Sequence, residues 1–135
     1  MAIDEDVAYG QNGEATSSMG PVFADIDPCT FNLDPAQAEC FLRGGRRDKL
    51  RALLPVHLYG QCADMSSLQR LADEFHLSVI EDAAQAIGAR WGSCKAGSMG
   101  VSAAFSFYPT KNLSAYGDAG SVSYTHLTLP TNREV

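Results

Sequence analysis

Two stripes of apolar residues recur at helical spacing along the chain, and each follows an aspartate. The first stripe ends at Leu42 and begins just after Asp34 and Pro35. An aspartate at the N-cap accepts hydrogen bonds from the first amides of a helix, and proline suits the first helical position. The pattern therefore predicts a helix that begins after Asp34 and ends at Gly44 and Gly45.

The second stripe predicts an amphipathic helix capped by Asp64. Its apolar members recur every three or four residues, which places them on one face of a helix. They are Met65, Leu68, Leu71, Ala72 and Phe75. We interpret this face as core packing and not as a cofactor-binding surface.

Short apolar or alternating runs outside the helices predict strands. These runs cover residues 21–26, 53–59, 78–82, 103–108 and 119–123. The glycine-rich segment 87–100 predicts a loop or a hairpin. Residues 1–18, which are polar and rich in glycine and serine, predict a poorly ordered lead-in. The alternation of strands and helices favours an α/β layer built on a largely parallel sheet.

Length and charge limit the classes of function. The 135 residues make one ordinary domain, and ten Lys and Arg against sixteen Asp and Glu give a net charge of −6. This balance argues against a nucleic-acid surface, which needs a basic stripe. No apolar run is long enough to predict a membrane span, and the acidic start Met-Ala-Ile-Asp-Glu-Asp lacks the apolar core of a secretory signal. We expect a cytoplasmic protein.

The cysteines favour free thiols in a reducing compartment. They are Cys29, Cys40, Cys62 and Cys94. They include no Cys-x-x-Cys pair, and no histidine lies near them in metal-ligand spacing. We therefore expect no metal site, and no disulfide framework, because the chain is not a small cysteine-dense scaffold.

Phosphate binding has one candidate, a basic cluster near the end of the first predicted helix. Its members are Arg43, Arg46, Arg47, Lys49 and Arg51. Solvated charge at a helix C-terminus is favoured by the helix dipole, and we prefer that interpretation. The sequence has no glycine-rich loop of the dinucleotide-binding or P-loop type and no Gly-x-Ser-x-Gly. A flavodoxin-like nucleotide-binding module is therefore a weaker alternative.

Reactive side chains are concentrated where two predicted strands end. Asp82 and Gln85 follow one strand, and Ser106 and Lys111 follow another. In open α/β sheets, ligands bind beyond the carboxyl ends of the strands, so these four residues form a candidate site. Each also has an ordinary alternative: a turn cap for Asp82, a loop contact for Ser106, and a surface position for Lys111.

Several blocks of the sequence resemble one enzyme family in their order and spacing. The blocks are Pro21-Val-Phe-Ala-Asp-Ile-Asp-Pro with Asn32-Leu-Asp-Pro, Pro55-Val-His-Leu-Tyr-Gly-Gln-Cys-Ala-Asp-Met, Val79-Ile-Glu-Asp-Ala-Ala-Gln-Ala-Ile-Gly-Ala, Phe105-Ser-Phe-Tyr-Pro-Thr-Lys-Asn-Leu and Tyr116-Gly-Asp-Ala-Gly. Over residues 19–122 the chain resembles the DegT/DnrJ/EryC1/StrS family of pyridoxal-phosphate-dependent sugar aminotransferases, which have fold type I. The resemblance implies part of the large domain of such an enzyme, a mostly parallel sheet flanked by helices.

The resemblance also implies a role for each residue of the candidate site. Lys111 matches the lysine that forms a Schiff base with pyridoxal 5'-phosphate, and Asp82 matches the carboxylate that pairs with the pyridine nitrogen. Gln85 matches the residue at the cofactor's 3-oxygen, and Ser106 matches the serine at its phosphate. Family members that act as dehydratases carry histidine in place of the lysine, so Lys111 favours the aminotransferase branch.

The implied reaction transfers an amino group, from glutamate as the usual donor, to a keto sugar nucleotide in cell-surface or secondary-metabolite sugar biosynthesis. The implied assembly is a homodimer. Family members are much longer, so we expect a lead-in at 1–18 unlike the family, a partial cofactor-binding large domain at 19–123 and a non-native tail at 124–135. We expect the parent protein to be the enzyme and this chain to be inactive alone. A non-catalytic α/β binding module is the alternative.

Overall fold

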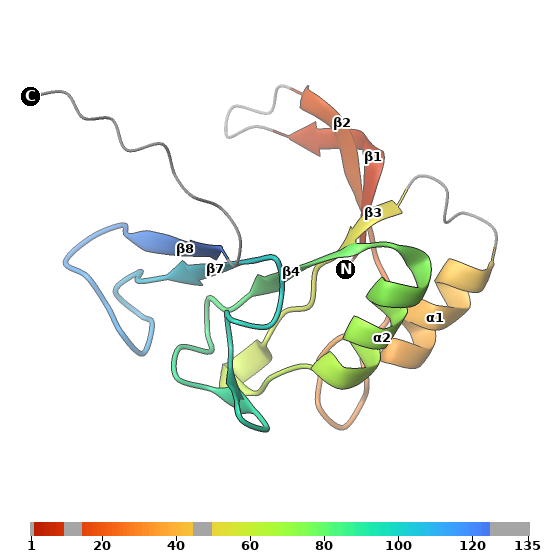
Figure 1. The fold of residues 1–135 in the computed structure, drawn as a ribbon. Coiled ribbons are helices and arrows are strands. Elements are labelled where there is room, and N and C mark those ends of the chain that lie inside the picture. Colours follow the sequence, from red (N-terminus) through yellow and green to blue (C-terminus); the bar gives the residue numbers. More distant parts are fainter. Residues whose placement is uncertain (1, 10–14, 45–49, 125–135) are drawn as a thin grey trace, which may run out of the picture.

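The computed structural model describes residues 2–9, 15–44 and 50–124, with side chains from Pro21 onward. Within these residues the strands form a six-stranded sheet, in the order β2-β1-β3-β4-β7-β8, and a two-stranded hairpin (Figure 1). The strands are β1 (Ala2–Tyr9), β2 (Ala15–Val22), β3 (Leu50–Leu53), β4 (Ser78–Asp82), β5 (Arg90–Trp91), β6 (Cys94–Lys95), β7 (Ser102–Ser106) and β8 (Gly120–Tyr124). The helices are α1 (Pro35–Arg43), α2 (Met65–Phe75) and the short 3₁₀ helix η2 (Leu58–Gly60). The α/β class predicted from the sequence is confirmed.

The centre of the sheet is parallel and its outer strands are antiparallel. β4 lies between β3 and β7 and runs parallel to both, with Asp82 opposite Ala104. Parallel neighbours need a crossover, and α2 lies in the connection from β3 to β4. β8 returns antiparallel to β7, with Ser106 opposite Gly120. The carboxyl ends of β4 and β7 therefore lie at the same edge of the sheet, where we expect the candidate site.

Both predicted helices form, with the predicted caps. The Ala36 N–H donates to Asp34 Oδ1 at 2.8 Å, and α1 ends at Gly44. The Ser67 N–H donates to Asp64 Oδ1 at 3.1 Å at the start of α2. These caps satisfy amides that have no partner inside the helix, which is why both starting points are visible in the sequence.

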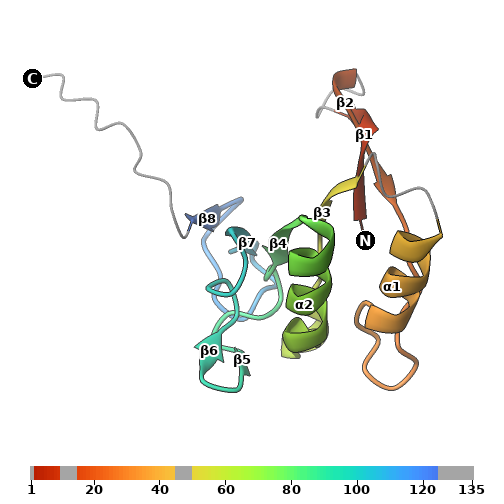
Figure 2. The same ribbon diagram turned by 45° about the vertical axis from the view of Figure 1, so that its right-hand side comes forward.

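The two helices lie side by side and pack on the sheet (Figure 2). Their buried faces meet β3 and β4 in one apolar core, whose larger members include Leu42, Leu53, Leu68, Leu71 and Val79. Burying one side chain of this size contributes about 1.5–3 kcal/mol. The core predicted from the second stripe is therefore confirmed, and it anchors the two strands that lead to the candidate site.

The predicted strand at 53–59 is wrong in its bounds. β3 ends before Pro55, which has no N–H to donate to a neighbouring strand. The pairing resumes only as a single bridge between Val56 and Asp82. The chain then turns in η2, where Tyr59 has a left-handed backbone with φ of 54°. The apolar run thus leaves the sheet and forms a turn above its edge.

The N-terminal segment also differs from its prediction. Within residues 1–18 the structure places β1 and part of β2, which pair antiparallel, although the sequence there predicts no regular element. This pairing depends on hydrogen bonds to a partner strand, which local periodicity does not reveal. The strand predicted at 21–26 is correct only as far as Val22, where β2 ends and the loop to α1 begins.

The remaining strand predictions are confirmed. β4 covers the predicted run at 78–82, and the segment 87–100 contains the β5–β6 hairpin. β7 and β8 overlap the runs at 103–108 and 119–123. The glycines of 87–100 mark the hairpin turn, and Pro109 marks the end of the run at 103–108.

The other sequence features have plain structural positions. The Arg43 side chain contacts Glu39 at 2.8 Å and Glu74 at 2.7 Å, which fits solvated charge better than phosphate binding. Arg46, Arg47, Lys49 and the tail from 125 lie outside the described residues. All four cysteines are free thiols. Among the described residues, no helix has the length and apolar character to cross a membrane.

Candidate functional site

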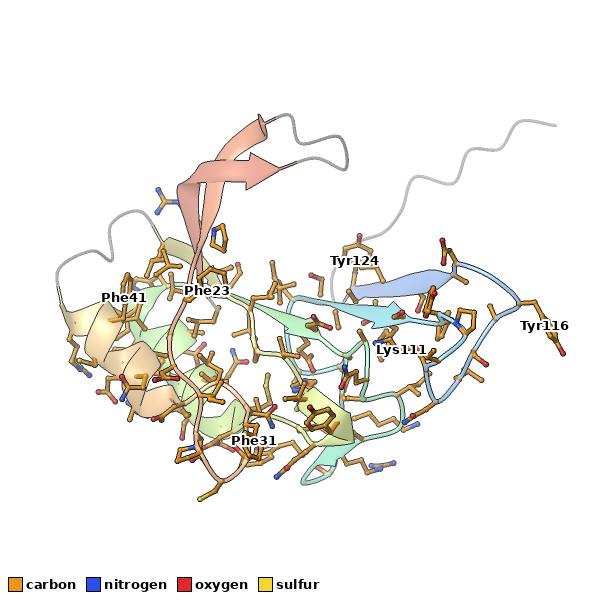
Figure 3. The ribbon with its side chains drawn as sticks, turned by 180° about the vertical axis from the view of Figure 1, so that it is seen from behind. Phe23, Phe31, Phe41, Lys111, Tyr116 and Tyr124 are labelled. Carbon is orange, nitrogen blue, oxygen red and sulfur yellow. The ribbon has the colours of Figure 1, made fainter. Side chains whose placement is uncertain are left out.

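The candidate site lies at the edge of the sheet where β4 and β7 end. Asp82 is the last residue of β4, and Ser106 is the last residue of β7. Gln85 follows in the turn after β4, and Lys111 lies on the loop after β7, where Figure 3 labels it. Parallel pairing of the two strands therefore brings all four sequence-predicted residues to one side of the molecule.

A hollow of about 380 Å³ opens at this edge, which is within the size range of small-ligand sites. Its lining residues are Tyr59, Gln85, Thr110, Lys111 and Asn112. They come from three separate segments: η2, the turn after β4 and the loop after β7. The structure thus brings Gln85 and Lys111 into one hollow, whereas Asp82 and Ser106 are not among its lining residues.

Asp82 and Ser106 both make short-range contacts that orient their side chains. The Ala84 N–H donates to Asp82 Oδ1 at 3.0 Å, so this carboxylate also caps the turn that carries Gln85. The Tyr108 N–H donates to Ser106 Oγ at 3.3 Å. These contacts are the ordinary structural roles considered for the two residues, and they occur at the sheet edge where the hollow lies.

The Gln85 amide has a defined orientation. The Tyr59 N–H donates to Gln85 Oε1 at 3.0 Å. A backbone N–H requires an acceptor, so the oxygen of the amide must face Tyr59, and the NH₂ group is the end left for a ligand. In the hollow, Gln85 therefore acts as a hydrogen-bond donor.

Three buried polar residues lie behind the hollow, and sequence reasoning did not single them out. They are Asn32, His57 and Glu81. His57 Nε2 lies 2.9 Å from Glu81 Oε2, and the Ala63 N–H donates to His57 Nδ1 at 3.1 Å. Because Nδ1 accepts, the ring proton sits on Nε2, which donates to the carboxylate. Glu81 directly follows the apolar pair Val79 and Ile80 and precedes Asp82 at the end of β4, and that position was the available signal.

Glu81 also accepts hydrogen bonds from the backbone of the segment between Gly97 and Gly100. The N–H groups of Gly97, Met99 and Gly100 donate to its two oxygens at 2.6–2.7 Å. Burial raises the pKa of Glu81, but the hydrogen bonds from His57 and from these backbone amides together outweigh it, so the pKa lies below its ordinary value. Glu81 therefore stays ionised and ties the segment before β7 to β4.

Cys62 lies next to this network but does not have the character of a nucleophile. Its side chain is buried. Burial, and then the charge of Glu81, raise the pKa of the Cys62 thiol. A reactive cysteine needs a lowered pKa, because the thiolate is the nucleophile. The chemistry available at this edge therefore belongs to the amine of Lys111 and the polar groups around it.

Comparison with known proteins identifies relatives with the same sequence blocks. A profile of the DegT/DnrJ/EryC1/StrS aminotransferase family matches residues 14–129. A pleiotropic regulatory protein of Geobacillus stearothermophilus is 52% identical over 108 residues, which are 80% of this chain and 28% of that protein. A dTDP-3-amino-3,4,6-trideoxy-alpha-D-glucose transaminase of Streptomyces venezuelae is 57% identical over 110 residues, which are 80% of this chain and 28% of that protein.

Solved structures of this family share the fold. A DegT DnrJ EryC1 StrS aminotransferase from Brucella abortus matches 78% of this chain and 29% of its own, with a TM-score of 0.74 and 36% identity. NtdA from Bacillus subtilis, solved with bound cofactor PMP, matches 79% of this chain and 23% of its own, with a TM-score of 0.67 and 34% identity.

The family match includes part of the lead-in and extends past Tyr124, so it is wider than the resemblance noted in the sequence. The chain spans little more than a quarter of the length of the curated relatives described above. Over that span, the sequence and the fold both agree with the family. The chain belongs to the DegT/DnrJ/EryC1/StrS aminotransferase family.

Proposed function

We propose that this chain carries the lysine-bearing part of a pyridoxal-phosphate-dependent sugar aminotransferase. The observation that carries the proposal is the shared hollow at the carboxyl edge of the sheet, which both Lys111 and Gln85 line. Family membership supports the reaction class, and the transaminase name of the Streptomyces venezuelae relative supports a nucleotide-sugar substrate.

The residues present fit the cofactor. Gln85 presents an NH₂ donor to the hollow, which suits an oxygen substituent on the cofactor ring. The Tyr108 N–H occupies a lone pair of Ser106 Oγ, so the hydroxyl proton is available to a phosphate oxygen. The Ala84 N–H holds Oδ1 of Asp82, which leaves Oδ2 for a ring nitrogen. These are donors and acceptors of the kind that each part of the cofactor needs.

Lys111 is the proposed catalytic residue. Its amine would hold the cofactor by condensing with the aldehyde, with loss of water, and as a free amine it would move a proton as general base and then as general acid. Asp82 would hold the ring nitrogen and favour its protonated form, because a carboxylate stabilises a neighbouring positive charge. When bound, the cofactor supplies the electron sink that stabilises a carbanion.

The proposed reaction moves an amino group from glutamate to a ketone on a nucleotide-linked sugar. We assign it to a homodimeric, cytoplasmic protein with the length of the relatives. In this proposal the 135-residue chain alone does not catalyse the reaction, because it spans little more than a quarter of the length of those relatives.

Borohydride trapping tests the proposal. The chain is mixed with pyridoxal phosphate, reduced with borohydride, and mapped by peptide mass. We expect the adduct to be concentrated on Lys111 and to disappear in Lys111→Ala. Lys95→Ala is the matched control, because Lys95 is an exposed residue of the β6 strand outside the hollow, and it should leave the label on Lys111. Equal labelling of Lys95 and Lys111 would contradict the proposal and favour a binding module without this chemistry.

A further inference from the structure

We propose that Asn32 is a positioning residue that sets the direction of the Gln85 amide through the η2 turn. The inference rests on the proposed function, because it concerns the donor that Gln85 presents to the cofactor. Asn32 lies 53 residues before Gln85 in the chain and makes no contact with the hollow. It acts on the turn that holds Gln85.

The Asn32 side chain spans η2 from one side to the other. Its Oδ1 accepts from the Leu58 N–H at 2.9 Å, and its Nδ2 donates to the Gln61 carbonyl at 3.1 Å. The side chain is buried, so both ends of the amide are used where water does not replace them. One side chain therefore fixes the residues just before and just after Tyr59 and Gly60.

The turn needs this support because its backbone is strained. Tyr59 has φ of 54° and Gly60 has φ of 83°, which are successive left-handed conformations. Glycine adopts them freely, but a residue with a bulky side chain does so only where its surroundings hold it. The Tyr59 side chain does not provide the support, since it is 82% exposed.

The His57–Glu81 pair supports the same turn from below. His57 is the residue before η2, and its N–H donates to the Asp82 carbonyl at 2.9 Å. Its ring is held by Glu81 and by Ala63. The turn is thus fixed to β4 beneath it and to Asn32 beside it. The Tyr59 N–H is the group of this turn that donates to the Gln85 side chain.

The η2 turn determines which end of the Gln85 amide faces the hollow. While the turn is held, the Tyr59 N–H fixes Gln85 Oε1, and the amide presents NH₂ to the hollow. If the turn relaxes, the amide loses that contact and can rotate, and its oxygen then faces the cofactor's own oxygen, which also accepts hydrogen bonds. Asn32 therefore affects cofactor binding without touching the cofactor.

Asn32→Asp is the test variant. It keeps the acceptor for Leu58 and replaces the donor to Gln61 by an acceptor. The control is Leu42→Ala, which weakens the core at α1 away from the turn. Amide hydrogen exchange is measured by NMR on the chain without cofactor, as the ratio of the Tyr59 rate to the Leu68 rate. We expect the ratio to rise about tenfold in Asn32→Asp and not to rise in Leu42→Ala, because loss of core packing raises the Leu68 rate at least as much as the Tyr59 rate.

An unchanged ratio in Asn32→Asp overturns the inference. If Asn32→Asp does not fold, Asn32→Ser replaces it, since a hydroxyl is too short to bridge Leu58 and Gln61. The readout needs no cofactor, so it is independent of the borohydride label on the unsubstituted chain. If that chain shows no label on Lys111 but the ratio rises in Asn32→Asp, the proposed function alone is contradicted. If that chain carries the label but the ratio does not change in Asn32→Asp, this inference alone is contradicted.

Discussion

His57 Nε2 donates to Glu81 Oε2 across 2.9 Å, with both side chains fully buried. The pair joins the strand that carries Asp82 to the turn that holds Gln85. A buried charge is costly unless its hydrogen bonds are complete, and here Glu81 accepts four of them. Substitutions in this pair therefore test directly how β4 and the turn are held together.

Glu81→Gln should destabilise the fold. Glutamine has the same shape, but its NH₂ group must face two N–H groups whose hydrogen bonds Glu81 now accepts. His57 cannot change its tautomer to compensate, because its Nδ1 already accepts from the Ala63 N–H. We expect a loss of about 3 kcal/mol in the free energy of unfolding, measured in urea. Glu74→Gln, on the exposed surface between the helices, should cost about 0.5 kcal/mol or less. Equal losses in the two variants would contradict the role given to Glu81.

The free energy of unfolding should decrease as the pH is lowered, because Glu81 then takes up a proton. Its folded-state pKa lies below the ordinary value of 4.5, so the stabilisation is complete above that value and is lost as pH falls through the folded pKa. Urea midpoints measured downward from about pH 7 should therefore converge between the wild type and Glu81→Gln below about pH 4.5. Parallel curves over this range would assign the acid sensitivity to other carboxylates.

Gly97→Ala should be more damaging than Gly92→Ala. Both glycines have a left-handed φ, 85° and 59°, so alanine costs backbone strain at each, about 1 kcal/mol. A Cβ on Gly97 would also lie 2.1 Å from Phe105 Cζ, whereas one on Gly92 would meet nothing within 4 Å. We expect an additional loss of about 1–3 kcal/mol at Gly97 from this overlap, measured by thermal or urea unfolding. Similar losses at the two positions would show that Phe105 moves aside.

Gln85→Glu should weaken cofactor binding without unfolding the chain. A carboxylate still accepts from the Tyr59 N–H, but it has no proton to donate into the hollow. We expect affinity for pyridoxal phosphate to fall by about 10- to 100-fold, measured by absorbance titration. Gln69→Glu makes the same chemical change on the exposed face of α2 and should leave the affinity unchanged. A matching loss in both variants would mean that net charge, and not the Gln85 donor, controls binding.

The sequence predicts best those features whose partners lie close along the chain. Both helix caps are of this kind, since Asp34 and Asp64 bond amides two and three residues away. The strand at 53–59 was misplaced because apolar character alone does not show where Pro55 interrupts the ladder. Lys111 and Gln85 were found as site candidates by strand-end position and by resemblance, and the structure places both in the hollow.

The buried polar residues were missed for the opposite reason. His57 and Glu81 are 24 residues apart, and Asn32 is 26 residues from Leu58. Read singly in the sequence, this histidine and this glutamate have no assigned partner, and only the folded chain supplies one. The same separation explains why the turn at Tyr59 is invisible in the sequence pattern, although it determines how Gln85 is held.

Because Cys62 is buried, the rate at which its thiol is alkylated depends on how often the surrounding segment opens. Cys29, Cys40 and Cys94 are exposed thiols, whereas Cys62 is covered and precedes Ala63, whose N–H is held by His57. An alkylating reagent should therefore modify three thiols at once and the fourth only when the segment behind the hollow opens. The rate of that last modification counts openings of the segment that supports the site, in the unaltered chain and without a spectroscopic label.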